Sequence, residues 1–268
     1  MSNKTRSKRR SSRNILSSAP WAKVAFALTA AVALTVAGVV AAVVILRSDG
    51  EQGPPSAVII DQLSLTQPNP SFFGDVRAVL EPAGYQVHYV RGEAVTVDYY
   101  RQLPKLGYDI VLVRAHSALA EEGSGTFTDE ASLFTGEPYS SSEQVDDQRA
   151  GMVTQNFYDE TSTDAYFGVA PSFVQHAMKG DFHGALVVLM GCDVLRGDML
   201  SKAFLGRGAD AVVGWDGPVS AVHTDAATLS VLGHYLSDGH SAQAAASAAM
   251  DELGPDPLYG ASLLSAGP

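Results

Sequence analysis

Two stretches decide the fold: DIVLVRAHS at residues 109–117 and LVVLMGCD at residues 186–193. Each begins with a short, continuous apolar run and ends in small and polar residues. Runs of this length, bounded by turn residues, are typical of strands buried on both faces. Such strands occur mainly in parallel sheets that helices cover on both sides. The two stretches therefore predict an α/β domain with a mainly parallel sheet.

The rest of the domain fits this prediction. Short apolar runs alternate with segments of helical periodicity, and the residues between 116 and 186 are rich in Ser, Thr, Asp and Glu. We expect a hairpin and extra edge elements in that polar stretch, covering one end of the sheet. Further strands are expected at residues 57–61, 85–90 and 211–213, and helices at residues 71–81, 97–106, 199–206, 224–237 and 241–253.

Two chemically active side chains follow the two deciding strands. His116 comes after the first strand, and Cys192, the only cysteine, comes after the second. Ligands of open parallel sheets bind beyond the carboxyl ends of the strands. If the two strands are neighbours, His116 can take the thiol proton of Cys192 and activate it as a nucleophile. The backbone N–H of Cys192 can stabilise the resulting oxyanion.

Each of these residues also has a structural interpretation. Cys192 fits a small buried side chain in a tight turn, and His116 fits a hydrogen-bonded loop histidine. Trp215 and Asp216 end the next strand, where they line the same cleft or cap the sheet. Asp225 caps the following helix or recognises a basic substrate side chain.

The two deciding stretches resemble the paired strand-end motifs of caspase- and gingipain-like cysteine peptidases. LSKAFLGRGADAVVGW at residues 200–215 is similar to the segment after the nucleophile in that family. The resemblance covers residues 57–250 and implies a caspase-like three-layer α/β/α sandwich with a catalytic His116–Cys192 dyad. Ser117 stands where many members have glycine. Expected substrate contacts are Ser117, Asp193, Trp215, Asp216 and Asp225.

The function implied is that of an endopeptidase acting through a thioester, with a peptide or protein as substrate and no cofactor. The alternative is an inactive domain of the same fold that serves as a binding or structural module at the cell surface. With Asp193, Asp216 and Asp225 near the cleft, we expect a preference for Lys or Arg before the cleaved bond.

The N-terminal region predicts a membrane anchor. Residues 24–46 form an apolar run that would span about 35 Å as a helix, enough for a hydrocarbon core of about 30 Å. A buried core helix and a cleaved signal peptide are the alternatives. Residues 1–23 are basic, which places them in the cytoplasm and the C-terminal domain outside. Residues 47–56 form a linker, and residues 57–268 the domain.

Charge and motif patterns exclude several other functions. Eight of the 18 basic residues and none of the 29 acidic residues lie in residues 1–47, so residues 48–268 carry a net charge of −19. A domain this acidic repels nucleic acid. The spacing of His and Cys is not that of a zinc site. Residues 123–126 lack the lysine of a phosphate-binding loop, and no dinucleotide fingerprint comes after the first strand.

Overall fold

The computed structural model of the protein describes residues 53–121, 127–159, 161–237 and 241–267. No helix within these ranges has the length and apolar character needed to cross a membrane. The predicted basic tail, membrane-spanning segment and most of the linker lie outside the described residues. All described residues belong to one unit, Asp49–Pro268.

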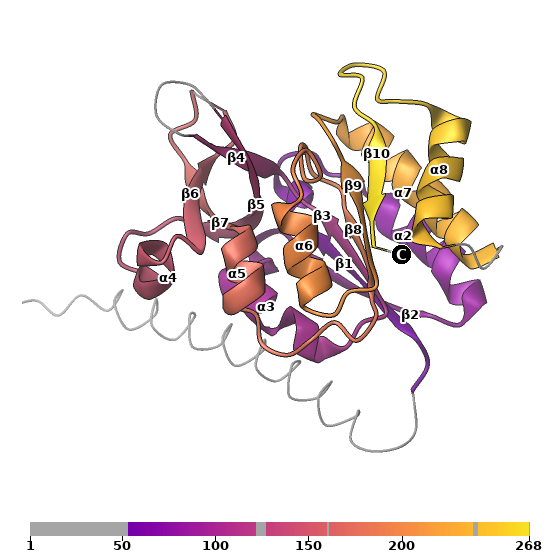
Figure 1. The fold of residues 1–268 in the computed structure, drawn as a ribbon, viewed down its shortest axis with the longest axis horizontal. Helices are drawn as coiled ribbons and strands as arrows, with labels where there is room; N and C mark the ends of the chain where they lie inside the picture. Colours follow the sequence, from indigo (N-terminus) through magenta and orange to yellow (C-terminus); the bar gives the residue numbers. More distant parts are fainter. Residues whose placement is uncertain (1–52, 122–126, 160, 238–240, 268) are drawn as a thin grey trace, which may run out of the picture. The chain divides into compact units, whose positions relative to one another are not determined.

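The larger sheet has six strands in the order β10-β9-β8-β3-β1-β2 (Figure 1). Five of them run parallel, and only β10 is antiparallel to its neighbour. The prediction of an α/β fold with a mainly parallel sheet is therefore confirmed. The strands are β1 (Ser56–Asp61), β2 (Gln86–Arg91), β3 (Ile110–Arg114), β8 (Leu186–Leu189), β9 (Ala211–Trp215) and β10 (Leu263–Ala266).

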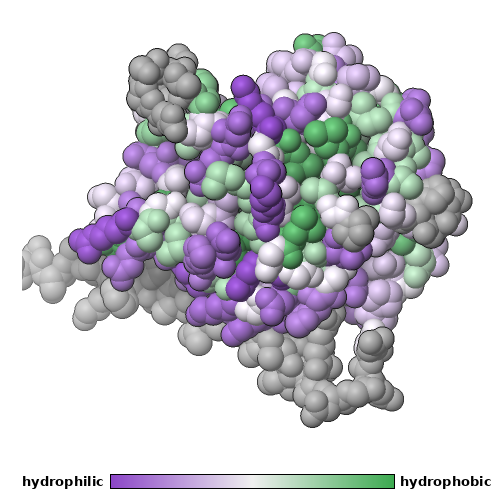
Figure 2. All heavy atoms as spheres, viewed as in Figure 1, coloured by the Kyte–Doolittle hydropathy of each residue, from purple (hydrophilic) through white to green (hydrophobic). Residues whose placement is uncertain are grey.

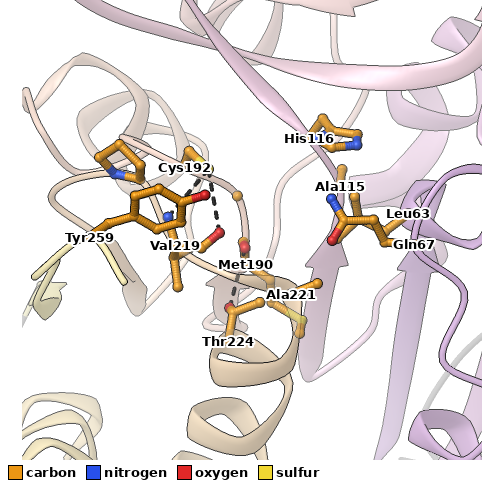
Figure 3. A pocket seen from close by; sticks show the side chains of 12 residues that line it. Leu63, Gln67, Ala115, His116, Met190, Cys192, Val219, Ala221, Thr224 and Tyr259 are labelled. Atoms are coloured by element: carbon orange, nitrogen blue, oxygen red, sulfur yellow. Dashed lines mark hydrogen bonds between the residues drawn. The ribbon is translucent and has the colours of Figure 1, made fainter. Parts of the chain in front are cut away.

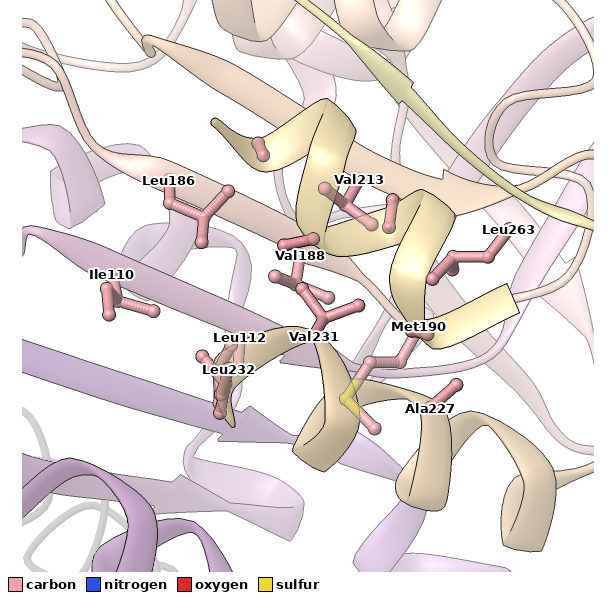
Figure 4. Packing of buried hydrophobic residues seen from close by; sticks show 14 of the residues in the cluster. Ile110, Leu112, Leu186, Val188, Met190, Val213, Ala227, Val231, Leu232 and Leu263 are labelled. Carbon is pink, nitrogen blue, oxygen red and sulfur yellow. The ribbon is translucent and has the colours of Figure 1, made fainter. Parts of the chain in front are cut away.

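Helices cover this sheet on two faces, as Figure 1 shows. Side chains of successive strand residues point to opposite faces, so fully apolar strands need a cover on each side. On one face, Val188, Leu112 and Met190 pack against Val231 and Leu232 of α7 (Figure 4). The helices of this face are α2 (Phe72–Leu80), α7 (Ala221–Ser237) and α8 (Ala242–Leu253), and those of the other are α3 (Val97–Gln102), α5 (Pro171–His176) and α6 (Met199–Gly206).

The polar middle of the chain, for which the sequence predicts a hairpin and extra edge elements, folds into a second sheet. Its order is β4-β5-β7-β6, and every pairing is antiparallel. Alternating polar and apolar residues are typical of strands with one solvated face, and they resemble loop sequence when they are short. The strands are β4 (Ser117–Glu121), β5 (Phe127–Pro138), β6 (Val153–Phe157) and β7 (Ala165–Val169), with helix α4 (Val145–Arg149) before β6.

Most expected helices are confirmed within a few residues. Helix α6 has the predicted bounds, and the amide of Ala244 donates to Oγ of Ser241, the predicted cap of α8. Helix α7 begins at Ala221, three residues before the expected start, which matters for Asp225. Short 3-10 turns complete the elements: η1 (Gln62–Leu65), η2 (Glu81–Ala83), η3 (Gly92–Ala94) and η4 (Leu103–Leu106).

The strand order defines where a ligand can bind. The chain goes from β1 to β2 on one side, and then to β3 on the other side of β1. This reversal makes the carboxyl ends of β1 and β3 a switch point, where open α/β sheets bind their ligands. Turn η1 after β1, the loop after β3 and the loop after β8 all begin at this edge.

Candidate active site

His116 and Cys192 lie at the carboxyl ends of neighbouring strands. His116 follows β3 after one residue, and Cys192 follows β8 after two. The two strands are parallel partners, with Val113 opposite Leu189. Both side chains line one cavity of about 220 Å³ (Figure 3). The predicted placement of the two residues in one cleft is therefore confirmed, while their catalytic role stays a prediction.

The side chain of His116 is held by its own set of contacts. Its Nε2 lies 2.9 Å from Oγ1 of Thr66, and its backbone amide donates to Oε1 of Gln62 at 3.0 Å. The rings of Phe134 and Tyr158 pack against the imidazole. Burial and the nearby positive charge of Arg114 lower the pKa of His116 to about 4. The imidazole is therefore neutral at pH 7, with its Nε2 bonded to Thr66.

The thiol of Cys192 bonds to the loop before α7. The backbone amide of Val219 donates to Sγ at 3.4 Å, and the carbonyl of Val219 lies 3.7 Å from Sγ. Burial raises the pKa of Cys192, and the carboxylates of Asp193 and Asp256 raise it further, against the lowering effect of the Val219 amide. Cys192 is therefore a neutral thiol at pH 7. His116 and Cys192 share a cavity but form hydrogen bonds with different partners.

The turn that presents Cys192 depends on a close approach of two strand ends. A Cβ on Gly191 would lie 2.8 Å from both the Ala115 carbonyl oxygen and Oγ of Ser117, closer than real Cβ contacts occur. Oγ of Ser117 donates to the carbonyl of Cys192. Asp193 then adopts a left-handed conformation with φ of 56°, which Asp tolerates better than most residues. Glycine before the cysteine is thus a steric requirement.

Comparisons with known proteins add nothing to this geometry. The chain matches no protein-family model and no curated protein. In the described ranges, no group of three or more His, Cys, Asp and Glu side chains is placed to hold a metal ion. The chemistry of the site therefore has to be inferred from its own contacts.

A buried ion-pair network lies next to the cavity. Nε and Nη2 of Arg114 donate to the two carboxylate oxygens of Asp225 at 2.7 and 3.0 Å, and Nη1 donates to Asp61 at 2.8 Å. Nδ2 of Asn69 donates to Asp225 as well. The Asp225 side chain is only 7% exposed. Because α7 begins four residues earlier, Asp225 does not cap it, and that expectation is wrong. Asp225 also does not line the cavity.

The remaining predicted contact residues also lie away from the cavity lining. Trp215 is 1% exposed, and its Nε1 donates to Oγ1 of Thr224 at 2.9 Å, so its ring belongs to the core. Asp216 accepts the amide of Ser262 at 2.7 Å. Oδ1 of Asp193 lies 3.4 Å from Nη1 of Arg196. Ser117 supports the backbone of Cys192 rather than lining the cavity.

The cavity is instead lined by residues that the sequence patterns did not single out. Leu63 and Gln67 come from the segment after β1, Val219 from the loop before α7, and Tyr259 from the loop between α8 and β10. The strand-end argument also applies to the first strand and points to Leu63 and Gln67. Tyr259 has no such signal, because the fold of its loop depends on Asp256, whose carboxylate accepts the amides of Leu258 and Tyr259.

A larger hollow lies on the second sheet. It encloses about 830 Å³ between β4, β5 and β6, with the exposed rings of Phe127 and Phe157 at its edge. Its lining includes the carboxylates of Glu130 and Asp159 but no histidine or cysteine. The hydroxyls of Ser132, Thr154 and Ser162 line this hollow without a histidine to activate them, so we place the candidate chemistry at the smaller cavity.

Proposed function

We propose that the protein is a membrane-anchored cysteine hydrolase, an endopeptidase with a caspase- or gingipain-like sandwich outside the cytoplasm. One observation carries the proposal: the only cysteine and a neutral histidine lie at the carboxyl ends of adjacent parallel strands and line one cavity. The mainly parallel sheet with helices on both faces supports the proposed sandwich. The basic N-terminal tail and the apolar run at residues 24–46 support the anchor and its orientation.

In the proposed reaction, Sγ of Cys192 attacks the carbonyl carbon of the peptide bond while the thiol proton passes to the imidazole of His116. The tetrahedral intermediate places its oxyanion at the turn. The amide of Met190 donates to the carbonyl of Val113, and the amide of Asp193 donates to the carbonyl of Gly217. The amides of Gly191 and Cys192 therefore stabilise the oxyanion in this proposal. The C–N bond then breaks, and His116 gives its proton to the leaving amine.

The second half of the reaction restores the enzyme. Water attacks the thioester of Cys192 as His116 accepts a proton from it, and the C–S bond breaks to release the acid. The sulfur then recovers a proton from His116. Because the pKa of His116 is lowered and the pKa of Cys192 is raised, the resting pair is neutral. Proton transfer therefore has to accompany attack, as in general-base catalysis, rather than precede it.

The same two pKa shifts favour the alternative function. A thiol and an imidazole that are both neutral and bonded elsewhere also fit a domain that binds a partner without catalysis. The two functions differ in one measurable property. That property is the reactivity of the Cys192 thiol toward a bound peptide. In a hydrolase His116 increases this reactivity, whereas in a binding module the thiol is only as reactive as its burial allows.

Labelling of the full-length chain with a peptide electrophile tests the proposal. A substrate-like peptide chloromethyl ketone and iodoacetamide are compared by intact mass, with Cys192→Ser as the blank. We expect His116→Ala to slow peptide labelling roughly 100-fold, the lower range for general-base catalysis. His176→Ala, an exposed histidine of α5, is the matched control. Equal labelling of wild type and His116→Ala would remove the hydrolase proposal and leave the binding module.

A further inference from the structure

The cavity wall beside Cys192 is apolar. Leu63, Met190 and Val219 are each at most 9% exposed, and they come from three different segments of the chain. Ala221, in the first turn of α7, completes this wall. Figure 3 shows Met190, Ala221 and Thr224 between the His116 side and the Cys192 side of the cavity. A side chain that enters next to the thiol therefore meets mainly methyl and methylene groups.

The polar group at the base of the cavity is already satisfied. Oγ1 of Thr224 accepts from Nε1 of Trp215 and donates to the carbonyl of Met190 at 3.2 Å. It has no further proton to offer a ligand. Apart from His116 and Cys192, the reacting pair, the other polar side chains of the lining are Gln67 and Tyr259, which are exposed at the rim, where water already solvates them. Beyond the groups assigned to the reaction, the interior therefore offers no polar side chain to bond a substrate side chain.

No charge is available to a ligand inside the cavity. The lining includes no carboxylate and no Lys or Arg. The charged groups around it are bonded to other partners: Arg114 binds Asp225, Asp61 and the carbonyl of Gln67. Asp193 lies against Arg196, and Asp256 accepts from Ser220 and Leu258. Burying an unpaired charge is costly, and burying an amide without a partner is costly as well. The cavity therefore disfavours Lys, Arg, Asp and Glu, and to a smaller degree Asn and Gln.

The size of the cavity narrows the choice further. Its volume of about 220 Å³ is below the range of roughly 300–1,000 Å³ typical of sites for whole small molecules. An apolar cavity of about 150 Å³ takes up a benzene-sized molecule. The space therefore suits one aliphatic side chain together with the carbonyl group that Cys192 attacks.

We propose that this cavity binds an uncharged aliphatic side chain, of the size of Val, Leu or Met, on the residue before the cleaved bond. This inference rests on the proposed hydrolase function and replaces the expectation of a basic residue. That expectation required Asp193, Asp216 or Asp225 to point into the cavity, and all three are bonded elsewhere. Selectivity comes from the desolvation of the wrong side chains and from the fit of the right one.

Peptide chloromethyl ketones that differ only at this residue test the inference on the full-length chain. We expect the Leu reagent to label Cys192 at least tenfold faster than the Arg and Asp reagents, since one or two methylenes in an apolar pocket already discriminate about 10–200-fold. Comparable rates for Leu and Arg, or a faster Arg or Asp reagent, would overturn it. Iodoacetamide alkylation without labelling by any peptide reagent would instead remove the hydrolase proposal itself.

A pair of substitutions on one helix turn gives an independent readout. Ala221→Asp adds a carboxylate to the cavity wall, and a carboxylate in the first turn of a helix is compatible with folding. We expect its Leu-to-Arg ratio of labelling rates to fall at least tenfold. Val222→Asp adds the same charge at a side chain that is 82% exposed and outside the lining, so the ratio should stay as in wild type. An unchanged ratio in Ala221→Asp would contradict the assigned pocket.

Discussion

Arg114 and Asp225 form a two-point ion pair that joins the end of β3 to the second turn of α7. Nε and Nη2 of Arg114 reach the two oxygens of Asp225 at 2.7 and 3.0 Å, and both side chains are buried. The neighbours of the pair in sequence, Ala115 and Thr224, line the cavity. The pair therefore fixes the distance between two walls of the site without facing a ligand.

Removal of Asp225 should destabilise the domain strongly. In Asp225→Ala, Arg114 keeps Asp61 but loses two buried charge-assisted hydrogen bonds. Breaking a buried pair from one side costs about 3–5 kcal/mol, and the retained Asp61 favours the lower value of roughly 3 kcal/mol. Urea unfolding followed by tryptophan fluorescence measures the change.

Asp129→Ala is the control for that measurement. Asp129 lies 3.5 Å from Arg196, but its side chain is 70% exposed, so the pair contributes little in water. We expect a change within about 1 kcal/mol of wild type. Equal losses in the two variants would mean that the buried network does not stabilise the fold as its geometry implies.

The sequence predicted the parallel sheet and the site at its edge because continuous apolar strands have a strong and local signal. Residues 111–113 and 187–189 are buried on both sides of the sheet, so no polar residue interrupts the apolar run in either strand. His116 and Cys192 could then be placed by counting from the strand ends. Figure 2 shows that apolar side chains also gather at the surface near α6 and β9, so composition alone would not have located the core.

The residues around the dyad could not be predicted in the same way. Trp215 is the last residue of β9, a position like those that precede His116 and Cys192. The alternation of side chains along the strand nevertheless points its ring into the core next to α7. The sequence predicts Asp225 near a helix start because nothing in it fixes the start of α7 at Ala221 rather than at Thr224. Its partner, Arg114, is 111 residues away. Contacts at such separations depend on the whole fold.

The membrane anchor is tested by topology. The basic residues before position 24 and the apolar run after them predict a cytoplasmic N-terminus and an external domain. A reporter that is active only outside the cytoplasm, fused after Pro268, should be active. Activity of a cytoplasm-specific reporter at the same position would overturn the orientation. A soluble mature form that begins near residue 48 would show a cleaved signal peptide instead.

The low pKa of His116 predicts a pH dependence of stability. The pKa is about 4 in the folded chain against an ordinary value of 6.5, mainly because of burial and then because of Arg114. Well above pH 6.5 the imidazole is neutral in both states. As the pH falls toward 4, the unfolded chain binds the proton first, so the free energy of unfolding decreases by up to roughly 3 kcal/mol.

His116→Gln isolates this contribution, because glutamine keeps a hydrogen-bonding group but does not titrate. Urea midpoints are measured from pH 7 to pH 4 for both proteins. We expect the wild type to lose more stability than the variant across this window, since carboxylates that titrate below pH 5 contribute equally to the two. Parallel curves for the two proteins would show that His116 is protonated as easily in the fold as in water.

Gly191 and Gly233 should respond in opposite directions to the same substitution. A methyl group on Gly191 would meet the Ala115 carbonyl and Oγ of Ser117 at 2.8 Å, whereas nothing lies within 4 Å of the corresponding position on Gly233 in helix α7. Gly191→Ala should destabilise the domain by about 1–3 kcal/mol and slow peptide labelling of Cys192, because the two strand ends must separate. Gly233→Ala should stabilise it by about 0.5–1 kcal/mol and leave labelling unchanged, since alanine loses less backbone entropy in a helix. Urea unfolding and labelling rates measured on both variants separate these effects. A neutral Gly191→Ala would show that the strand ends at the site can move apart freely.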